Sequence, residues 1–220
     1  MAQNGYVLAL VGSLFSLYAN ADVELAFLPM SGWEEKRFEG ETQYQVIQDD
    51  QFDTPVLFAQ SAASASGLIR EMDIDLVTTP WISWHWKVVQ PPNVTNETQK
   101  PQDDFALRIG VTVTPGFTMM SSKTIYYVWT PNQTYNNTWG NPFAPNAFKM
   151  LSANINKEMG AWQFVSRNVR DDFKRLYGKE YDTLTAVSIM SDSDNSKSEG
   201  AAYLSPIRFS PLPKLDVEHP

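Results

Sequence analysis

Residues 81–89 read WISWHWKVV, and together with residues 105–113, FALRIGVTV, they decide the fold. In both stretches large apolar side chains alternate with smaller or polar ones, which is the two-residue period of a half-buried β-strand. The apolar face of the first stretch carries Ile82, Trp84, Trp86 and Val88. The pattern therefore predicts two strands that each turn one face towards a hydrophobic core.

Other short β-prone runs are separated by turns and loops rich in Pro, Asn, Gly and Ser. They are residues 42–47, 55–59, 67–77, 124–130, 162–168, 185–190 and 202–209. Many short strands with such connections predict an all-β protein, an antiparallel β-sandwich of the jelly-roll type. Neither a repeat nor a second domain is apparent, so we expect residues 22–220 to form one β-sandwich domain.

One short helix is predicted at residues 169–177, VRDDFKRLY. Asn168 precedes it as an N-cap, Asp171 and Asp172 lie in its first turn, and Gly178 follows as a C-terminal stop. Such a short helix is expected to pack across one end of the sandwich.

The N-terminal residues have the pattern of a secretory signal peptide. Residues 6–18 form an apolar run, and small residues, Ala19 and Ala21, follow at the positions that a signal peptidase reads. We expect a signal peptide at residues 1–21 and an exported protein, periplasmic or secreted. The alternative is an apolar helix or strand retained in the fold. No later segment is apolar enough to cross a membrane, so the protein is not expected to span one.

Composition narrows the function further. The 220 residues contain no cysteine, which excludes a disulfide scaffold, a thiol nucleophile and a cysteine metal site. The net charge of −8 argues against nucleic acid as a partner, because such binding needs a basic surface. Only two histidines are present, His85 and His219, and the second lies in the terminal tail.

Charged and aromatic side chains mark a candidate ligand-binding face. If residues 81–89 and 105–113 pair in one sheet, their polar faces coincide, and the strand at 124–130 adds aromatic rings. Such a face suits a glycan, because sugar C–H groups stack on rings while hydroxyls bind charged groups. The predicted ligand-binding residues are Lys87, Asp104, Arg108, Tyr127, Trp129 and Trp139. The alternative is a solvated face with ordinary cross-strand ion pairs.

The first hypothesis is therefore an exported envelope module that binds a glycan or polysaccharide without turnover, and an enzyme is the second. A lyase acting on an acidic polysaccharide could use Arg108 to neutralise a uronate, with His85 or Tyr127 as base and acid. Carboxylate pairs, as a glycoside hydrolase needs, occur at Asp73 and Asp75 and at Glu34 and Glu35. Asp73 and Asp75 have a suitable spacing along a strand, although any solvent-facing strand can show it. The third hypothesis is a structural or assembly protein that binds another envelope protein through an exposed patch.

Asp192, Asp194 and Asn195 resemble the start of an oxygen-rich calcium loop. The glycine and the later glutamate of an EF-hand loop are missing, and Asx-rich turns also occur without metal. We therefore expect either no cofactor or a structural calcium ion.

Several stretches together resemble the bacterial domain-of-unknown-function 3047 family over residues 38–209. They are Phe38-Glu39-Gly40, Ala65-Ser66-Gly67-Leu68, Trp84-x-Trp86-Lys87-Val88, Asp103-Asp104-Phe105-Ala106-x-Arg108, Tyr127-x-Trp129 and Asp192-x-Asp194-Asn195. The resemblance implies a bacterial exported protein with a jelly-roll body and names no activity. Arginine often stands at the position of His85 in this family, which argues against an essential His85. The end of the chain is also loosely similar to carbohydrate-binding jelly rolls, although fold style does not fix function.

Overall fold

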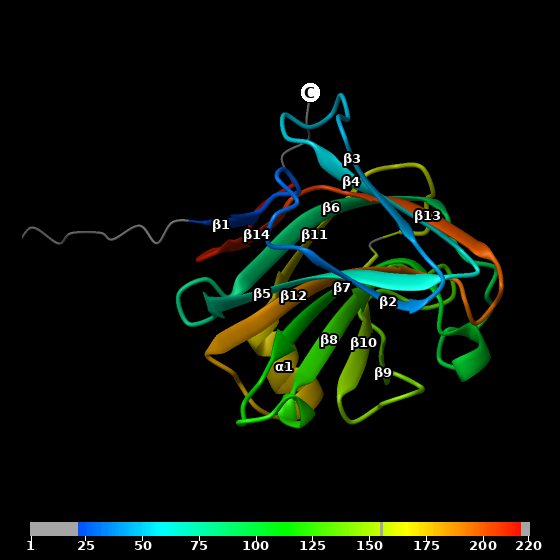
Figure 1. The fold of residues 1–220 in the computed structure, drawn as a ribbon. Coiled ribbons are helices and arrows are strands. Elements are labelled where there is room, and N and C mark those ends of the chain that lie inside the picture. The colour runs from blue at the N-terminus through cyan, green and yellow to red at the C-terminus, as the bar shows by residue number, and fades with distance from the viewer. Residues whose placement is uncertain (1–21, 155, 217–220) are drawn as a thin grey trace, which may run out of the picture.

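The structure, a computed structural model, describes residues 22–154 and 156–216 and arranges their strands in two sheets (Figure 1). The predicted signal peptide lies outside the described residues. Side chains from both sheets form a common hydrophobic core between them. The architecture is therefore the predicted β-sandwich.

The upper layer in Figure 1, sheet A, has seven strands among the described residues. In spatial order they are β1 (Val23–Leu25), β14 (Ile207–Ser210), β6 (Trp81–Gln90), β13 (Glu199–Leu204), β4 (Val56–Ala62) and β3 (Gln43–Ile47), with β11 (Gln163–Asn168) paired to β6. These pairs are antiparallel, as predicted.

The lower layer, sheet B, also has seven strands in the described part of the chain. Their order is β2 (Glu34–Glu39), β5 (Ala65–Asp75), β12 (Thr183–Asp192), β7 (Phe105–Val113), β8 (Lys123–Val128), β10 (Phe148–Ser152) and β9 (Thr138–Gly140). The pairing of β10 with β8 is parallel, and the other pairs are antiparallel. Short 3-10 helices occur at η1 (Lys100–Gln102) and η2 (Met119–Ser121).

Every predicted strand is present, but four short strands were missed. The missed strands are β1, β2, β9 and β10. All six residues of β2 are exposed, so it lacks the alternation that reveals a half-buried strand. Charged residues on such an edge strand discourage pairing with another molecule. The predicted strand at 202–209 divides into β13 and β14 around Pro206, which has no N–H for the ladder.

The tryptophans of β6 lie in the core, as the alternation predicts. Trp84 and Trp86 are 1% and 0% exposed. The Trp84 ring centroid lies 5.4 Å from that of Tyr127 on β8, so this pair joins the two sheets.

The predicted pairing of β6 with β7 is wrong. β6 belongs to sheet A, where its partners are β11, β13 and β14. β7 belongs to sheet B between β12 and β8. The long connection at residues 91–104 carries the chain from one sheet to the other, so the two polar strand faces point away from each other.

The helix α1 (Val169–Tyr177) has the predicted boundaries. The Asn168 side chain accepts a hydrogen bond from the Asp171 N–H at 3.1 Å. Gly178 ends the helix in the left-handed conformation, with φ of 73°. Phe173 is fully buried in the core. In the described part of the chain, no helix has the length and apolar character needed to cross a membrane.

Candidate functional site

The outer face of sheet B, which points away from sheet A, carries a groove of about 810 Å³. The strand register aligns two rows of residues across this face. The rows are Glu34, Ile69, Ser188, Gly110 and Tyr126, and Glu71, Ala186, Thr112, Thr124 and Phe148. Small side chains occupy the middle of the rows, over β12 and β7, and larger ones stand at the sides. The groove therefore runs along the strands, and its volume is that of a typical ligand site.

Gly110 gives the groove its depth. A Cβ atom at this position would lie 2.2 Å from Ser188 Oγ and 2.7 Å from Tyr126 Cε1. The Tyr126 ring can lie against the sheet only because glycine has no side chain. A larger residue would displace this ring towards the open groove.

The β2–β5 side of the groove is charged. Glu34, Glu35 and Glu71 contribute carboxylates, and Lys36 contributes one ammonium group. Glu35 forms an ion pair with Arg37, with Nε and Oε1 3.1 Å apart. This side therefore offers hydrogen-bond acceptors and a negative potential.

The β8–β10 side and the adjoining loop are mainly apolar. Tyr126 and Phe148 present half-buried rings. Met119 and Met120, on the loop between β7 and β8, line the same groove and are largely exposed. Rings and thioethers on one side thus face carboxylates on the other.

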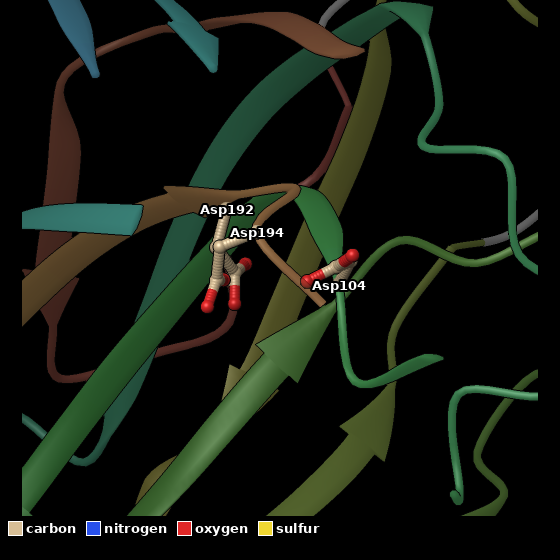
Figure 2. A group of neighbouring side chains, drawn as sticks. All are labelled: Asp104, Asp192 and Asp194. Atoms are coloured by element: carbon tan, nitrogen blue, oxygen red, sulfur yellow. The ribbon is translucent and has the colours of Figure 1, made fainter. Parts of the chain in front are cut away.

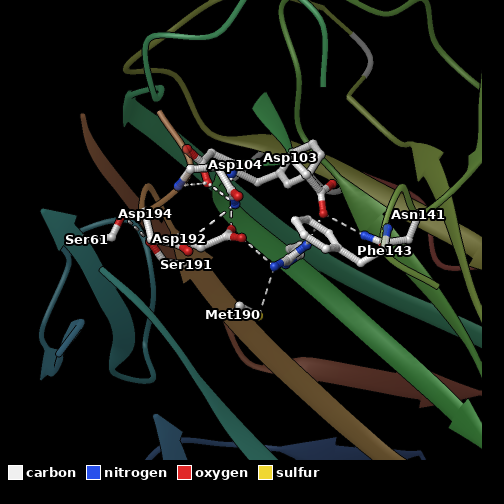
Figure 3. A network of polar contacts seen from close by, with 12 residues as sticks. Ser61, Asp103, Asp104, Asn141, Phe143, Met190, Ser191, Asp192 and Asp194 are labelled. Carbon is white, nitrogen blue, oxygen red and sulfur yellow. Dashed lines mark hydrogen bonds and ion pairs between the residues drawn. The ribbon is translucent and has the colours of Figure 1, made fainter. Parts of the chain in front are cut away.

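Beyond Met190, at one end of the groove, lies a buried set of polar groups that we call the carboxylate network (Figure 3). It consists of Arg108, Asp103, Asp104, Asn141 and Asp192. Arg108 forms ion pairs with Asp192 and, at 3.8 Å, with Asp103. The Arg108 side chain is only 7% exposed, so its charge interacts with carboxylates of the protein and not with a ligand in solution.

Burial changes the acidity of the carboxylate network. It raises the pKa of Asp103 from the usual 3.8 to about 6, although Arg108 and the hydrogen bond from Asn141 act in the opposite direction. The pKa of Asp192 is also raised well above its usual value by burial.

Asp104, Asp192 and Asp194 bring carboxylate oxygens within 4.8 Å of one another (Figure 2). Asp104 accepts hydrogen bonds from the N–H groups of Asn195 and Ser196, at 3.2 and 2.6 Å. Asp192 accepts from the Phe105 N–H at 3.2 Å and pairs with Arg108.

A calcium ion would compete with these donors for the same oxygens. Asn195 also turns its amide nitrogen, not its oxygen, to Asp104, at 3.1 Å. A calcium ion at the predicted ligands Asp192, Asp194 and Asn195 would therefore have to replace these hydrogen bonds. Calcium binding stays a prediction that a titration would test.

The predicted ligand-binding residues are not brought together. Lys87 lies on the outer face of sheet A, with Nζ 4.7 Å from the ring centroids of both Trp162 and Tyr203. It also lies 3.0 Å from Asp49 Oδ2. Asp104 and Arg108 are buried in the carboxylate network of sheet B. Lys87 and Arg108 therefore lie on opposite layers, contrary to the prediction, because β6 and β7 are in different sheets.

The predicted aromatic ligands are mostly core residues. Tyr127 and Trp129 are 0% and 2% exposed. The Tyr127 hydroxyl donates to Asp172 Oδ2 at 3.1 Å, and burial raises its pKa well above the usual value. Trp139 on β9 is half-buried against a small apolar cluster. Tyr127 and Trp129 cannot stack on a glycan, contrary to the prediction, because their rings are buried in the protein.

The predicted catalytic candidates lie in three separate places. His85 lines a small pocket of about 170 Å³ on the outer face of sheet A, and its Nε2 lies 3.2 Å from Asp216 Oδ1. Tyr127 is in the core and Arg108 is in the carboxylate network. They cannot converge on one sugar, so the structure contradicts this catalytic set.

The sequence prediction did not assign the groove residues to the binding site, although Glu34 and Glu35 were noted as a carboxylate pair. Glu34, Lys36 and Phe38 belong to the unpredicted strand β2. Tyr126 was visible as the outward neighbour of Tyr127 in the alternating run TIYYVWT. No local signal places β2 beside β5, so the β2–β5 side of the groove required the structure.

Residues 31–208 match the family described as "Protein of unknown function (DUF3047)". A comparison with curated protein sequences gives no match. Among solved structures, the chain is similar to a family 11 carbohydrate-binding module of a cellulosomal cellulase from Clostridium thermocellum, with 9% identity and a TM-score of 0.50. That match covers 89% of this chain and 98% of the other.

Two further structures are less similar. One is a family 30 carbohydrate-binding module of a Clostridium thermocellum cellulase, with 11% identity, a TM-score of 0.47, and 86% and 97% of the two chains covered. The other is the glycoside hydrolase domain of Endo-D from Streptococcus pneumoniae, with 7% identity, a TM-score of 0.44, and 82% and 22% covered. At these identities the likeness concerns the fold alone.

Proposed function

The chain belongs to the DUF3047 family, whose name assigns no activity, and we propose that it is an exported module that binds a glycan without turnover. The binding site is the groove on the outer face of sheet B. The single observation that supports this proposal is a groove of about 810 Å³ with rings on one side and carboxylates on the other. Jelly-roll carbohydrate-binding modules have the same fold, but the groove itself supports the proposal.

The chemistry of the two sides suits a sugar chain. Tyr126 and Phe148 offer ring surfaces for sugar C–H groups. Glu34 and Glu71 offer charged acceptors for sugar hydroxyls, and such hydrogen bonds are stronger than neutral ones. The groove runs along the strands, so it suits a linear segment of several sugar units.

The negative charge of the groove distinguishes neutral from acidic polysaccharides as ligands. Three carboxylates and one ammonium group line the groove, and the whole chain carries a net charge of −8. A uronate polymer would be repelled by this surface. We therefore propose a neutral glycan rather than the acidic polysaccharide of the lyase hypothesis.

A glycan array with purified residues 22–220 tests this function. We expect binding to neutral glycans, and weaker binding in Tyr126→Ala and in Glu34→Gln. Tyr135→Ala is the matched control, because Tyr135 is exposed outside the groove. Glu34→Gln is included because Glu34 is exposed and its substitution leaves the core intact. The proposal fails if no glycan binds, or if both groove variants bind like the control.

A product assay on the same glycans separates binding from catalysis. Glu34 is paired diagonally with Glu71 across β2 and β5, a geometry that sets side chains about 7–8 Å apart. A glycoside hydrolase could use two carboxylates at about this separation. If the wild-type protein releases reducing ends and Glu71→Gln does not, the protein is a glycoside hydrolase and not a binding module without turnover.

Export rests on residues 1–21, outside the described structure. We propose that this segment is removed as a signal peptide and that the protein is periplasmic or secreted. N-terminal sequencing of the protein from its host should begin near Asp22. An intact N-terminus in the cytoplasmic fraction would contradict export.

A further inference from the structure

We propose that the natural ligand of the groove is amphipathic, a sugar that carries an alkyl or acyl chain. The chain would lie against a surface that we call the methionine rim, formed by Phe117, Met119 and Met120 on the loop between β7 and β8. This inference rests on the proposed glycan-binding function and adds the class of its ligand.

The methionine rim exposes three large apolar side chains within four residues. Phe117 is fully exposed, and Met119 and Met120 are 76% and 94% exposed. Full burial of each such side chain would contribute about 1.5–3 kcal/mol of favourable free energy, which is not gained while the side chain stays in water. Contiguous exposed apolar surface of this kind marks a binding surface in soluble proteins.

The exposure is built into an ordered loop. Ser121 Oγ accepts a hydrogen bond from the Gly116 N–H at 3.0 Å and donates to the Thr118 carbonyl at 2.7 Å. Ser122 Oγ and Thr114 Oγ1 lie 3.0 Å apart and tie the base of the loop. These contacts present Met119 and Met120 to solvent in a defined conformation.

The rim is continuous with the groove. Met119 and Met120 line it directly, next to Thr112, Thr124 and Phe148. An apolar chain that leaves the groove at this end would therefore remain in contact with apolar side chains.

Thioethers favour a flexible apolar ligand over a second sugar ring. A sugar face stacks on a rigid ring, whereas methionine is unbranched and adapts to irregular apolar shapes. The two sides of the groove also differ, because carboxylates lie on β2 and β5 while rings lie on β8 and β10. This division matches a ligand with one polar and one apolar part.

Titration calorimetry with hexyl, octyl and decyl glucosides, each below its micelle concentration, tests the inference. We expect the affinity to rise with chain length, by up to about fourfold for each methylene that becomes buried. In the double variant Met119→Gln with Met120→Gln, this dependence should disappear. Met159→Gln is the matched control, because Met159 is exposed but does not line the groove.

The outcomes separate this inference from the proposed function. Affinity that is independent of chain length, or a dependence on chain length that survives in the double variant, overturns the inference that the ligand is amphipathic. The proposed glycan binding is then still decided by the glycan array. Equal binding of a decyl chain on a zwitterionic amine-oxide head group would overturn glycan recognition itself. A dependence that is lost only in the double variant supports the inference.

Discussion

β7 and β12 carry two different polar regions, the carboxylate network near Arg108 and the groove around Gly110. In the carboxylate network, charged groups are buried and their partners come from loops and from both strands. In the groove, small residues keep the surface open and the charges stand at the edge. Although the two regions adjoin on the same strands, the charged groups of the carboxylate network are buried in the protein, whereas those of the groove stand at its exposed edge.

The contrast shows how conspicuous residues can mislead. Paired aspartates and an arginine in a strand resemble a binding site in the sequence, yet in the structure they bind groups of the same protein. Arg108 pairs with Asp103 and Asp192, and Asp104 accepts hydrogen bonds from Asn195 and Ser196. The groove instead depends on glycine, alanine and serine, which attract no attention in a sequence. Four substitutions test this distinction, from the largest expected effect to the smallest.

Arg108→Ala should lower the free energy of unfolding by about 3–5 kcal/mol, because it leaves Asp192 and Asp103 buried without their cation. Urea denaturation measures this loss. Arg37→Ala is the control, since its ion pairs are exposed, and it should cost less than about 1 kcal/mol. A loss below about 1 kcal/mol in Arg108→Ala would mean that the carboxylate network is not a stabilising unit.

Asp103→Asn should remove a pH dependence of stability. Because burial raises the pKa of Asp103 from 3.8 to about 6, its folded form binds a proton more tightly than its unfolded form. Its contribution is therefore complete below about pH 4 and is lost as the pH rises through about 6. A rise of about two pKa units corresponds to roughly 3 kcal/mol.

Urea denaturation of both proteins between about pH 3.5 and 7 measures this difference. The wild-type protein should lose more stability than Asp103→Asn over this window. Parallel stability curves would show that Asp103 does not titrate there. Asp171→Asn serves as the control, because Asp171 is exposed on α1.

Gly110→Ala should affect both regions. The new Cβ would overlap Ser188 Oγ and press on the Tyr126 ring, which costs about 1–3 kcal/mol and narrows the groove. We expect lower stability in urea and weaker glycan binding on the array. Adding Ser188→Ala should restore part of the stability, because it removes the nearer clash. Unchanged binding would show that the ligand does not reach the centre of the groove.

Glu71→Gln should leave stability within about 0.5 kcal/mol of wild type, because the side chain is exposed. Glycan affinity should fall by about fivefold, the effect of one hydrogen bond of about 1 kcal/mol. Glu39→Gln is the control, an exposed carboxylate on β2 that does not line the groove. Equal affinity of both variants would remove the acidic side from the binding site.

Much of the fold could be predicted because local patterns carry it. Alternation in β6 and β7 identified buried faces, and the cap residues of α1 fixed both of its ends. The candidate site was predicted poorly for a physical reason. Alternation tells which side chains share a face of one strand, but not which strands are neighbours. Lys87 and Arg108 were therefore assigned to one surface although they belong to different sheets.

The amino-acid sequence alone determined the longer strands, the aromatic core, the helix and the absence of cysteine chemistry, because these follow from composition and from periodicity within short segments. Only the tertiary structure decided that Arg108 is internal and that Glu34, Gly110 and Tyr126 share one groove. Strand partners in a sandwich are distant in the chain, and their register sets which side chains meet.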